Sequence, residues 1–216
     1  MSSYPGSPYL VKGGIVILNP VTTAVERIIS LQYNPDSLSR TLLVQGLGGE
    51  EGPGGEPFRI KGTPVETIKL DAELDATDQL ETADSSAVES GILAQLAALE
   101  TIIYPTSTQL LNNNKLSYSG SLEIIPMELP LSLFIWNKHR ILPVRITDFS
   151  ITEEAFDVNL NPIRAKISIG MKVLSVDNLG FDNKGSSLFM NYLQNKERLS
   201  KKFKGGTLNT LGINSI

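Results

Sequence analysis

Residues 64–74 alternate between apolar and polar side chains, and this alternation constrains the fold more than any other feature of the chain. One set of alternate positions is apolar and comprises Ile68, Leu70, Ala72 and Leu74. The intervening positions carry Val65, Thr67, Lys69, Asp71 and Glu73. Because a period of two sends successive side chains to opposite faces of a strand, the segment predicts a half-buried β-strand.

Further β-strands are expected on both sides of this segment. Runs rich in Val, Ile and Leu occupy residues 9–18, 26–33, 39–44, 116–125, 131–136, 141–151 and 163–175. Polar turn residues follow two of these runs, at 34–37 and at 137–140. Short links of this kind predict antiparallel neighbours.

Two segments have helical rather than strand periodicity. Apolar residues at 88, 92, 96, 99 and 103 fall on one stripe and predict a helix over about 86–103. The spacing of Leu188, Tyr192 and Leu199 predicts a second helix over about 186–202. The six-glycine stretch at 46–55, the Asn/Ser/Thr-rich residues 106–115 and the end of the chain at 205–216 are expected to be loops. The predicted fold class is therefore α+β, rich in β-structure.

The length of 216 residues, with 41% apolar side chains, suits one substantial domain. We expect a tail at 1–8, a domain over 9–180, and a C-terminal helix and tail over 181–216. The absence of cysteine excludes disulfides, thiolate nucleophiles and cysteine-bound metals. A net charge of −4 disfavours nucleic-acid binding. Residues 1–8 do not have the pattern of a signal peptide, and no apolar run is long enough to span a membrane, so we expect cytoplasmic synthesis.

Few residues suggest catalysis or metal binding. His139 is the only histidine, and its position in a turn between two basic residues favours a solvated side chain over a catalyst. The acids from Asp71 to Asp78 lack the glycine and glutamate positions of a calcium-binding EF-hand. The glycine-rich loop lacks the lysine of a phosphate-binding loop and contains two glutamates. We therefore expect no enzyme activity, no cofactor and no metal site.

Charge is distributed unevenly along the chain. Residues 66–89 contain eight acids and a single basic residue, Lys69. Near the C-terminus lies a basic cluster, Lys196, Arg198, Lys201, Lys202 and Lys204. Two solvated faces explain such a pattern. Opposite charges on separate surfaces would also steer the copies of a ring toward each other.

Four sequence blocks resemble the contractile injection system tube-protein family, in the order found there, over about residues 25–176. The first is LQYNPDSLSR at 31–40. The second is GTPVETI at 62–68, followed by ELDATDQLE at 73–81. The third is LAALE at 96–100, which leads to Tyr104-Pro105. The fourth comprises FIW at 134–136, LPVRI at 142–146, EEAFD at 153–157 and NLNPIRA at 159–165.

This resemblance implies a tail-tube-like subunit, with antiparallel sheets packed as a small barrel beside a helix. It implies a hexameric ring at the baseplate of a phage-tail-like particle, where the ring joins the trimeric spike to the hexameric inner tube. The implied partners are other copies of the chain, the spike, the inner-tube proteins, and the surrounding baseplate and sheath proteins. Better-known members carry a LysM peptidoglycan-binding module, for which the residues after the last strand are too few. A baseplate binding module for cell-wall glycan or cargo is the alternative.

Ten charged residues are candidates for subunit contacts. Asp71, Glu73, Asp75 and Asp78 belong to the acidic segment 66–81, which is expected to meet a neighbouring copy or to line the channel. The arginines Arg40, Arg145 and Arg164 are expected to pair with acids such as Glu153, Glu154 or Asp157. The alternative is a set of scattered surface pairs, each worth less than about 1 kcal/mol. Strand edges, including those of the hairpin 131–151, are expected to pair with the next copy.

Overall fold

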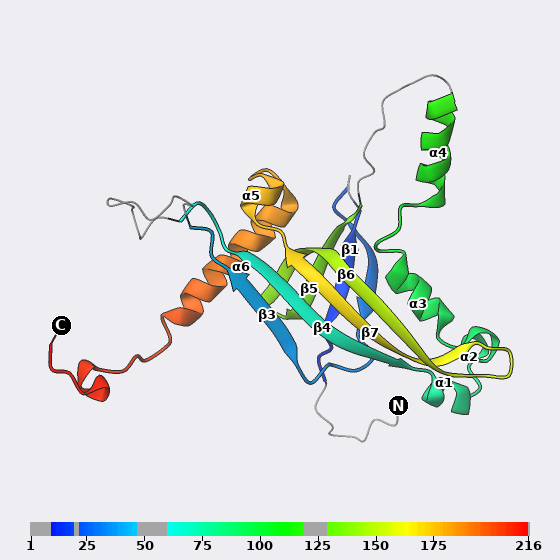
Figure 1. Ribbon diagram of the computed structural model, residues 1–216, viewed down its shortest axis with the longest axis horizontal. Coiled ribbons are helices and arrows are strands. Elements are labelled where there is room, and N and C mark those ends of the chain that lie inside the picture. The colour runs from blue at the N-terminus through cyan, green and yellow to red at the C-terminus, as the bar shows by residue number, and fades with distance from the viewer. Residues whose placement is uncertain (1–9, 20–21, 47–59, 119–128, 216) are drawn as a thin grey trace.

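The computed structural model describes residues 10–19, 22–46, 60–118 and 129–215. Seven strands form one antiparallel sheet in the order β2-β1-β5-β6-β7-β4-β3 (Figure 1). Their bounds are β1 Gly14–Leu18, β2 Val25–Ser30, β3 Leu38–Leu43, β4 Val65–Asp75, β5 Leu131–Asn137, β6 Arg140–Phe156 and β7 Pro162–Val173. The α+β fold class is confirmed. The expected tail at 1–8 and most of the expected loop at 46–55 lie outside the described residues.

The sheet is curled but not closed, so the barrel expected for the isolated subunit is not formed. The edge strands β2 and β3 do not pair with each other within the described residues. A short link, residues 31–37, nevertheless joins these two edges, which requires the sheet to bend toward itself. The side chain of Gln32 in this link bonds the backbone of Asp75 at the end of β4, with Nε2 donating to the carbonyl at 2.6 Å and Oε1 accepting from the amide at 3.0 Å. The Gln32 side chain thus joins the link to β4 at a place where a closed barrel would have paired strands.

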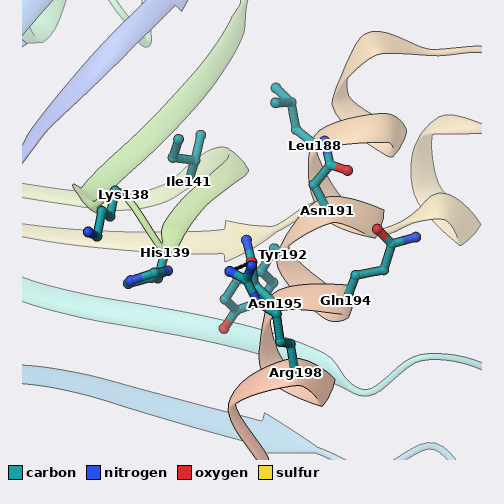
Figure 2. Close-up of a pocket in the computed structure, with 9 residues that line it drawn as sticks. All are labelled: Lys138, His139, Ile141, Leu188, Asn191, Tyr192, Gln194, Asn195 and Arg198. Atoms are coloured by element: carbon teal, nitrogen blue, oxygen red, sulfur yellow. Dashed lines mark hydrogen bonds between the residues drawn. The ribbon is translucent and has the colours of Figure 1, made fainter.

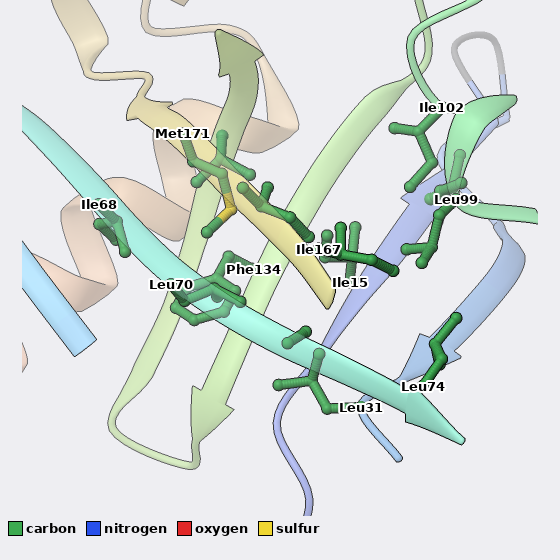
Figure 3. Packing of buried hydrophobic residues seen from close by; sticks show 14 of the residues in the cluster. Ile15, Leu31, Ile68, Leu70, Leu74, Leu99, Ile102, Phe134, Ile167 and Met171 are labelled. Carbon is green, nitrogen blue, oxygen red and sulfur yellow. The ribbon is translucent and has the colours of Figure 1, made fainter. Parts of the chain in front are cut away.

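The core lies inside the curl. The apolar set predicted on β4 is buried there, with Ile68 fully inaccessible to solvent and Leu70 3% exposed. Phe134 of β5 and Ile15 of β1 belong to the same cluster, although strands β6 and β7 separate them from β4 along the sheet. Figure 3 shows these side chains converging with Met171 of β7. The alternation of β4 therefore defines the inner face of the curled sheet.

The helix predicted over 86–103 is divided in two. Helix α1, Thr77–Glu81, follows β4, and α2, Ser85–Ser90, is separated from α3, Leu93–Glu100, by Gly91 and Ile92. Gly91 has φ +58°, and a Cβ at this position would lie 2.2 Å from the carbonyl oxygen of Pro162. Because β7 begins so close to the helix, the backbone must change direction at Gly91, where the sequence periodicity alone predicts a continuous helix.

The C-terminal helix is confirmed as α6, Lys184–Ser200, which follows the short α5, Val176–Leu179. The expectation of a loop at 106–115 was wrong, because α4 spans Ser107–Tyr118. Thr106 and Gln109 form reciprocal hydrogen bonds that cap its start. The strand expected at 116–125 therefore begins inside α4, and the rest of it lies outside the described residues. The end of the chain includes one 3-10 turn, η1, Leu208–Leu211.

Candidate subunit-assembly site

The two edges of the sheet expose apolar side chains. On β2, Val25 is 58% exposed and Ile28 is 68% exposed. On β3, Leu43 is 66% exposed, and Val44 directly after the strand is 68% exposed. Within the described residues each strand has a neighbour on one side only. An edge strand with free backbone groups and apolar side chains is a template for pairing with another chain.

One face of strands β4, β7 and β6 is polar throughout most of its length. The strand registers place these residues on it: Thr67, Lys69, Asp71, Glu73, Lys166, Ser168, Gly170, Lys172, Asp148, Ser150, Thr152 and Glu154. Helix α6 crosses the opposite side of the sheet, behind β3 and β4 in Figure 1. The candidate residues Asp71 and Glu73 are exposed here, as the alternation predicted. This surface, the polar sheet face, is hydrophilic and curved.

Arg40 contacts a buried carboxylate inside the chain. Its guanidinium lies 2.5 Å from Glu66 Oε1 and donates to the Tyr192 hydroxyl at 2.7 Å. Lys196 of α6 lies 3.2 Å from the other oxygen of Glu66 and 4.2 Å from the centre of the Tyr192 ring. The Glu66 side chain is 4% exposed. The cluster therefore fastens α6 to β3 and β4, since a buried carboxylate requires charged partners.

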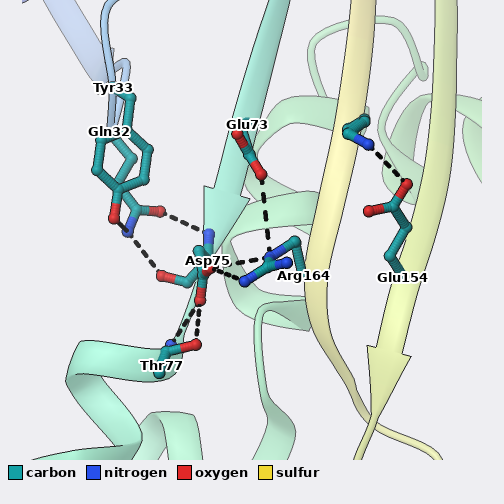
Figure 4. A network of polar contacts seen from close by, with 8 residues as sticks. Gln32, Tyr33, Glu73, Asp75, Thr77, Glu154 and Arg164 are labelled. Carbon is teal, nitrogen blue, oxygen red and sulfur yellow. Dashed lines mark hydrogen bonds and ion pairs between the residues drawn. The ribbon is translucent and has the colours of Figure 1, made fainter.

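Arg164 and Asp75 form a second cluster, at the opposite end of β4 (Figure 4). Arg164 Nη2 lies 2.8 Å from Asp75 Oδ2, and Arg164 Nε lies 3.9 Å from Glu73 Oε1. Thr77 donates to Asp75 Oδ1 through its amide at 2.8 Å and its hydroxyl at 2.5 Å. Partial burial alone would raise the pKa of Asp75, but the hydrogen bonds from Thr77 and Arg164 outweigh it and lower that pKa.

The tip of the β6–β7 hairpin is held by Asp157. Its Oδ1 accepts from the backbone amides of Asn159 at 2.7 Å and Asn161 at 2.8 Å, and its Oδ2 accepts from the Asn161 side chain at 2.9 Å. The hydrogen bonds from Asn161, and then that from Asn159, lower the pKa of Asp157. These bonds fix a turn that presents Val158, 98% exposed, and Leu160, 78% exposed. Asp157 therefore shapes the hairpin tip.

The structure gives the ion pairs within a single chain. There, Arg40 contacts Glu66, and Arg164 contacts Asp75 and Glu73, while Glu154 lies directly opposite Arg164 in the register of β6 and β7. Glu154 lies 3.0 Å from Lys166 across the strand pair. The other candidates, Asp71, Asp78, Arg145 and Glu153, form no ion pair with any described residue. Whether the ten candidates contact another subunit remains a prediction.

The sequence interpretation missed the partners on α6. Glu66 was grouped with the acidic segment, but it lies on the inner face with Ile68 and Leu70, in phase with the apolar set. The sequence did contain a signal for this, because Glu66 stands two residues before Ile68 and therefore shares the face of the buried apolar residues. Tyr192 and Lys196, four residues apart on one helix face, had no comparable signal, because their position over β4 depends on the path of the whole chain.

A cavity of about 430 Å³ lies between the β5–β6 turn and α6. Its lining comprises Lys138, His139, Ile141, Leu188, Asn191, Tyr192, Gln194, Asn195 and Arg198 (Figure 2). The turn is closed by Asn137, whose Oδ1 accepts from the His139 amide at 2.8 Å. His139 therefore lies in a turn, as predicted, but on the wall of a cavity. We call this cavity the basic cavity.

Two further findings bear on the chemistry. Within the described residues, no three His, Asp or Glu side chains lie close enough together to hold a metal ion. In the same part of the chain, no helix has both the length and the apolar character needed to cross a bilayer. Comparison with protein-family models gives no match, and comparison with curated proteins gives no significant match.

Proposed function

We propose that this chain is a structural, non-enzymatic subunit of a phage-tail-like contractile injection system. In this role it forms a hexameric ring at the baseplate and joins the trimeric spike to the inner tube. The observation that carries the proposal is a single curled sheet whose two apolar edge strands have no further strand partner among the described residues, and whose polar face is exposed there. Each of these features is a disadvantage in an isolated subunit and useful in a ring.

Strand pairing between copies would complete the sheet. In a head-to-tail ring, β3 of one copy would pair with β2 of the next, so every edge would gain a neighbour. The exposed Ile28 and Leu43 lie on these two strands, and pairing would shield them from water. A closed ring removes the edges that would otherwise promote aggregation.

The polar sheet face is suited to the wall of a water-filled channel. Its central positions, where strands β4 and β7 are paired, carry Asp71 opposite Ser168 and Lys69 opposite Gly170. Small and charged side chains of this kind do not adhere to apolar cargo, and they keep a channel hydrated. The resemblance to the tube-protein family supports the same assignment, because its blocks at 31–40 and 73–81 fall on the link between the sheet edges and on the end of β4.

Electron microscopy of the purified protein tests this function. The protein is imaged in negative stain with and without its spike partner, and particles are classified by symmetry. We expect six-fold rings in at least one of these preparations. Only single subunits in both preparations, with the protein folded, would contradict the proposal.

A charged edge variant tests the role of strand pairing. Leu43→Lys places a cation on the β3 edge and should prevent ring formation, while changing the free energy of unfolding by less than about 0.5 kcal/mol. Leu110→Lys is the matched control, since Leu110 is 49% exposed on α4, a helix that stands apart from the sheet in Figure 1. Rings formed by Leu43→Lys at the yield of the control would refute edge pairing through β3.

A further inference from the structure

The basic cavity carries positive charge without a neutralising acid. Its charged lining residues are Lys138 from the β5–β6 turn and Arg198 from α6, with His139 beside Lys138, and the described lining includes no Asp or Glu. Amide side chains of Asn191 and Asn195 add hydrogen-bonding groups. Lys138 and Arg198 are exposed, so both can reach a charge on another molecule. Such a lining favours an anionic partner.

The opposite pole of the molecule carries unpaired acids. Asp78 and Glu81 on α1, and Glu89 on α2, are exposed and form no ion pair within the described part of the chain. Asp78 and Glu81 are three residues apart, so they project from one side of α1. Asp84 between the helices is occupied as the cap of α2, where its Oδ1 accepts from the amides of Ser86 and Ala87. Helix α1 therefore presents two free carboxylates together.

The two charged regions lie at opposite ends of the molecule, each associated with a different edge of the sheet. Figure 1 shows α6 near β3, and α1 and α2 at the far end of β4. Arg40 of β3 bonds Tyr192 of α6, which places the basic side beside the β3 edge. Gln32, two residues after β2, bonds the backbone of Asp75, two residues before α1, which places the acidic side beside the end of the β2 edge.

We propose that the basic cavity of one copy receives the carboxylates of Asp78 and Glu81 from α1 of the next copy in the ring. This inference rests on the proposed ring function and names a second contact, outside the paired strand edges. The partner is another copy because the acidic pole belongs to this chain and is associated with the edge that β3 would meet. Two basic poles, or two acidic poles, repel each other, so the charges favour contacts in which the basic pole of one copy meets the acidic pole of another, as in a head-to-tail ring.

Charge reversal on each side tests the contact. One variant carries Lys138→Glu and Arg198→Glu, a second carries Asp78→Lys and Glu81→Lys, and a third carries all four substitutions. Association is measured by sedimentation velocity and by ring yield with the spike present, at two salt concentrations. Each double variant should associate about tenfold more weakly than the wild type, and the quadruple variant should recover to within about threefold.

A matched control separates this contact from a general effect of charge. Lys61→Glu with Lys115→Glu makes the same charge change at exposed sites outside the basic cavity and should associate as the wild type does. Unchanged association in either double variant would overturn the inference. So would a quadruple variant that is no better than the doubles, while all variants keep the wild-type thermal midpoint.

Disulfide cross-linking detects the contact between two copies even if no ring closes. Introduced cysteines report it without interference, because the chain has no cysteine of its own. Chains carrying Arg198→Cys are mixed with chains carrying Glu81→Cys and oxidised. A covalent heterodimer is expected, in excess over the control mixture of Arg198→Cys with Val158→Cys. Equal cross-linking in both mixtures would refute the contact. If rings form but the cross-link is not selective, the contact is refuted and the ring proposal stands. If the cross-link is selective but no rings form, the proposed ring is refuted.

Discussion

Replacing Glu66 by glutamine removes the negative charge from the cluster that fastens α6 to the sheet. The carboxylate is 4% exposed and contacts two cations, Arg40 at 2.5 Å and Lys196 at 3.2 Å. The hydroxyl of Tyr192 lies 3.2 Å from the same oxygen that Arg40 contacts. Glutamine keeps the shape and one acceptor, so the substitution tests the charge while leaving the packing nearly unchanged.

The expected cost follows from the burial of the three charges. Breaking a fully buried ion pair by removing one partner costs about 3–5 kcal/mol. Here the side chains of Arg40 and Lys196 are 24% and 38% exposed, so water can rehydrate both cations after the acid is lost. We therefore expect Glu66→Gln to lower the free energy of unfolding by about 2–3 kcal/mol. For a chain of this length, that corresponds to a fall in the thermal midpoint of about 4–12 °C.

Urea denaturation and hydrogen exchange together measure this effect. The midpoint and slope give the free energy of unfolding, and exchange should show lost protection in α6 while β6 and β7 stay protected. Glu154→Gln is the control, because the pair of Glu154 with Lys166 is exposed and should contribute less than about 1 kcal/mol. A cost for Glu66→Gln no larger than that of the control would refute the reasoning.

Two further predictions concern pH and backbone geometry. The pKa of Asp75 is lowered in the folded chain, so its ionisation stabilises the fold above the ordinary pKa of about 3.9 and loses that effect as pH falls. Asp75→Asn should therefore lower the free energy of unfolding at pH 7. The difference in this free energy from the wild type, measured by urea titration, should shrink as the pH is lowered toward 3. A difference that stays constant with pH would contradict the prediction. Gly91→Ala should cost at least about 2 kcal/mol by thermal denaturation, because of its positive φ and the adjacent Pro162 carbonyl. Gly205→Ala has open space around it and should be nearly neutral, and equal effects at the two glycines would show that the approach of Pro162 is unimportant.

The candidate site was predictable only in part. The outward position of Asp71 and Glu73 followed from the alternation of β4, because side-chain direction in a strand depends on neighbouring residues alone. The partner of Arg40 could not be derived in this way, because Arg40 and Glu66 meet through the pairing of β3 with β4. The basic cavity was equally hidden, since it forms where a turn at 137–140 meets a helix that begins at Lys184.

The sequence by itself determined most of the segments that became strands, that the C-terminal segment became a helix, and that the class is α+β. These features depend on periodicity and on turn residues, which act within a few positions along the chain. The tertiary structure decided the strand order, the curl of the sheet, the break at Gly91 and the burial of Glu66 among cations from β3 and α6. Each of these results from contacts between residues far apart in sequence, whose geometry no local pattern contains.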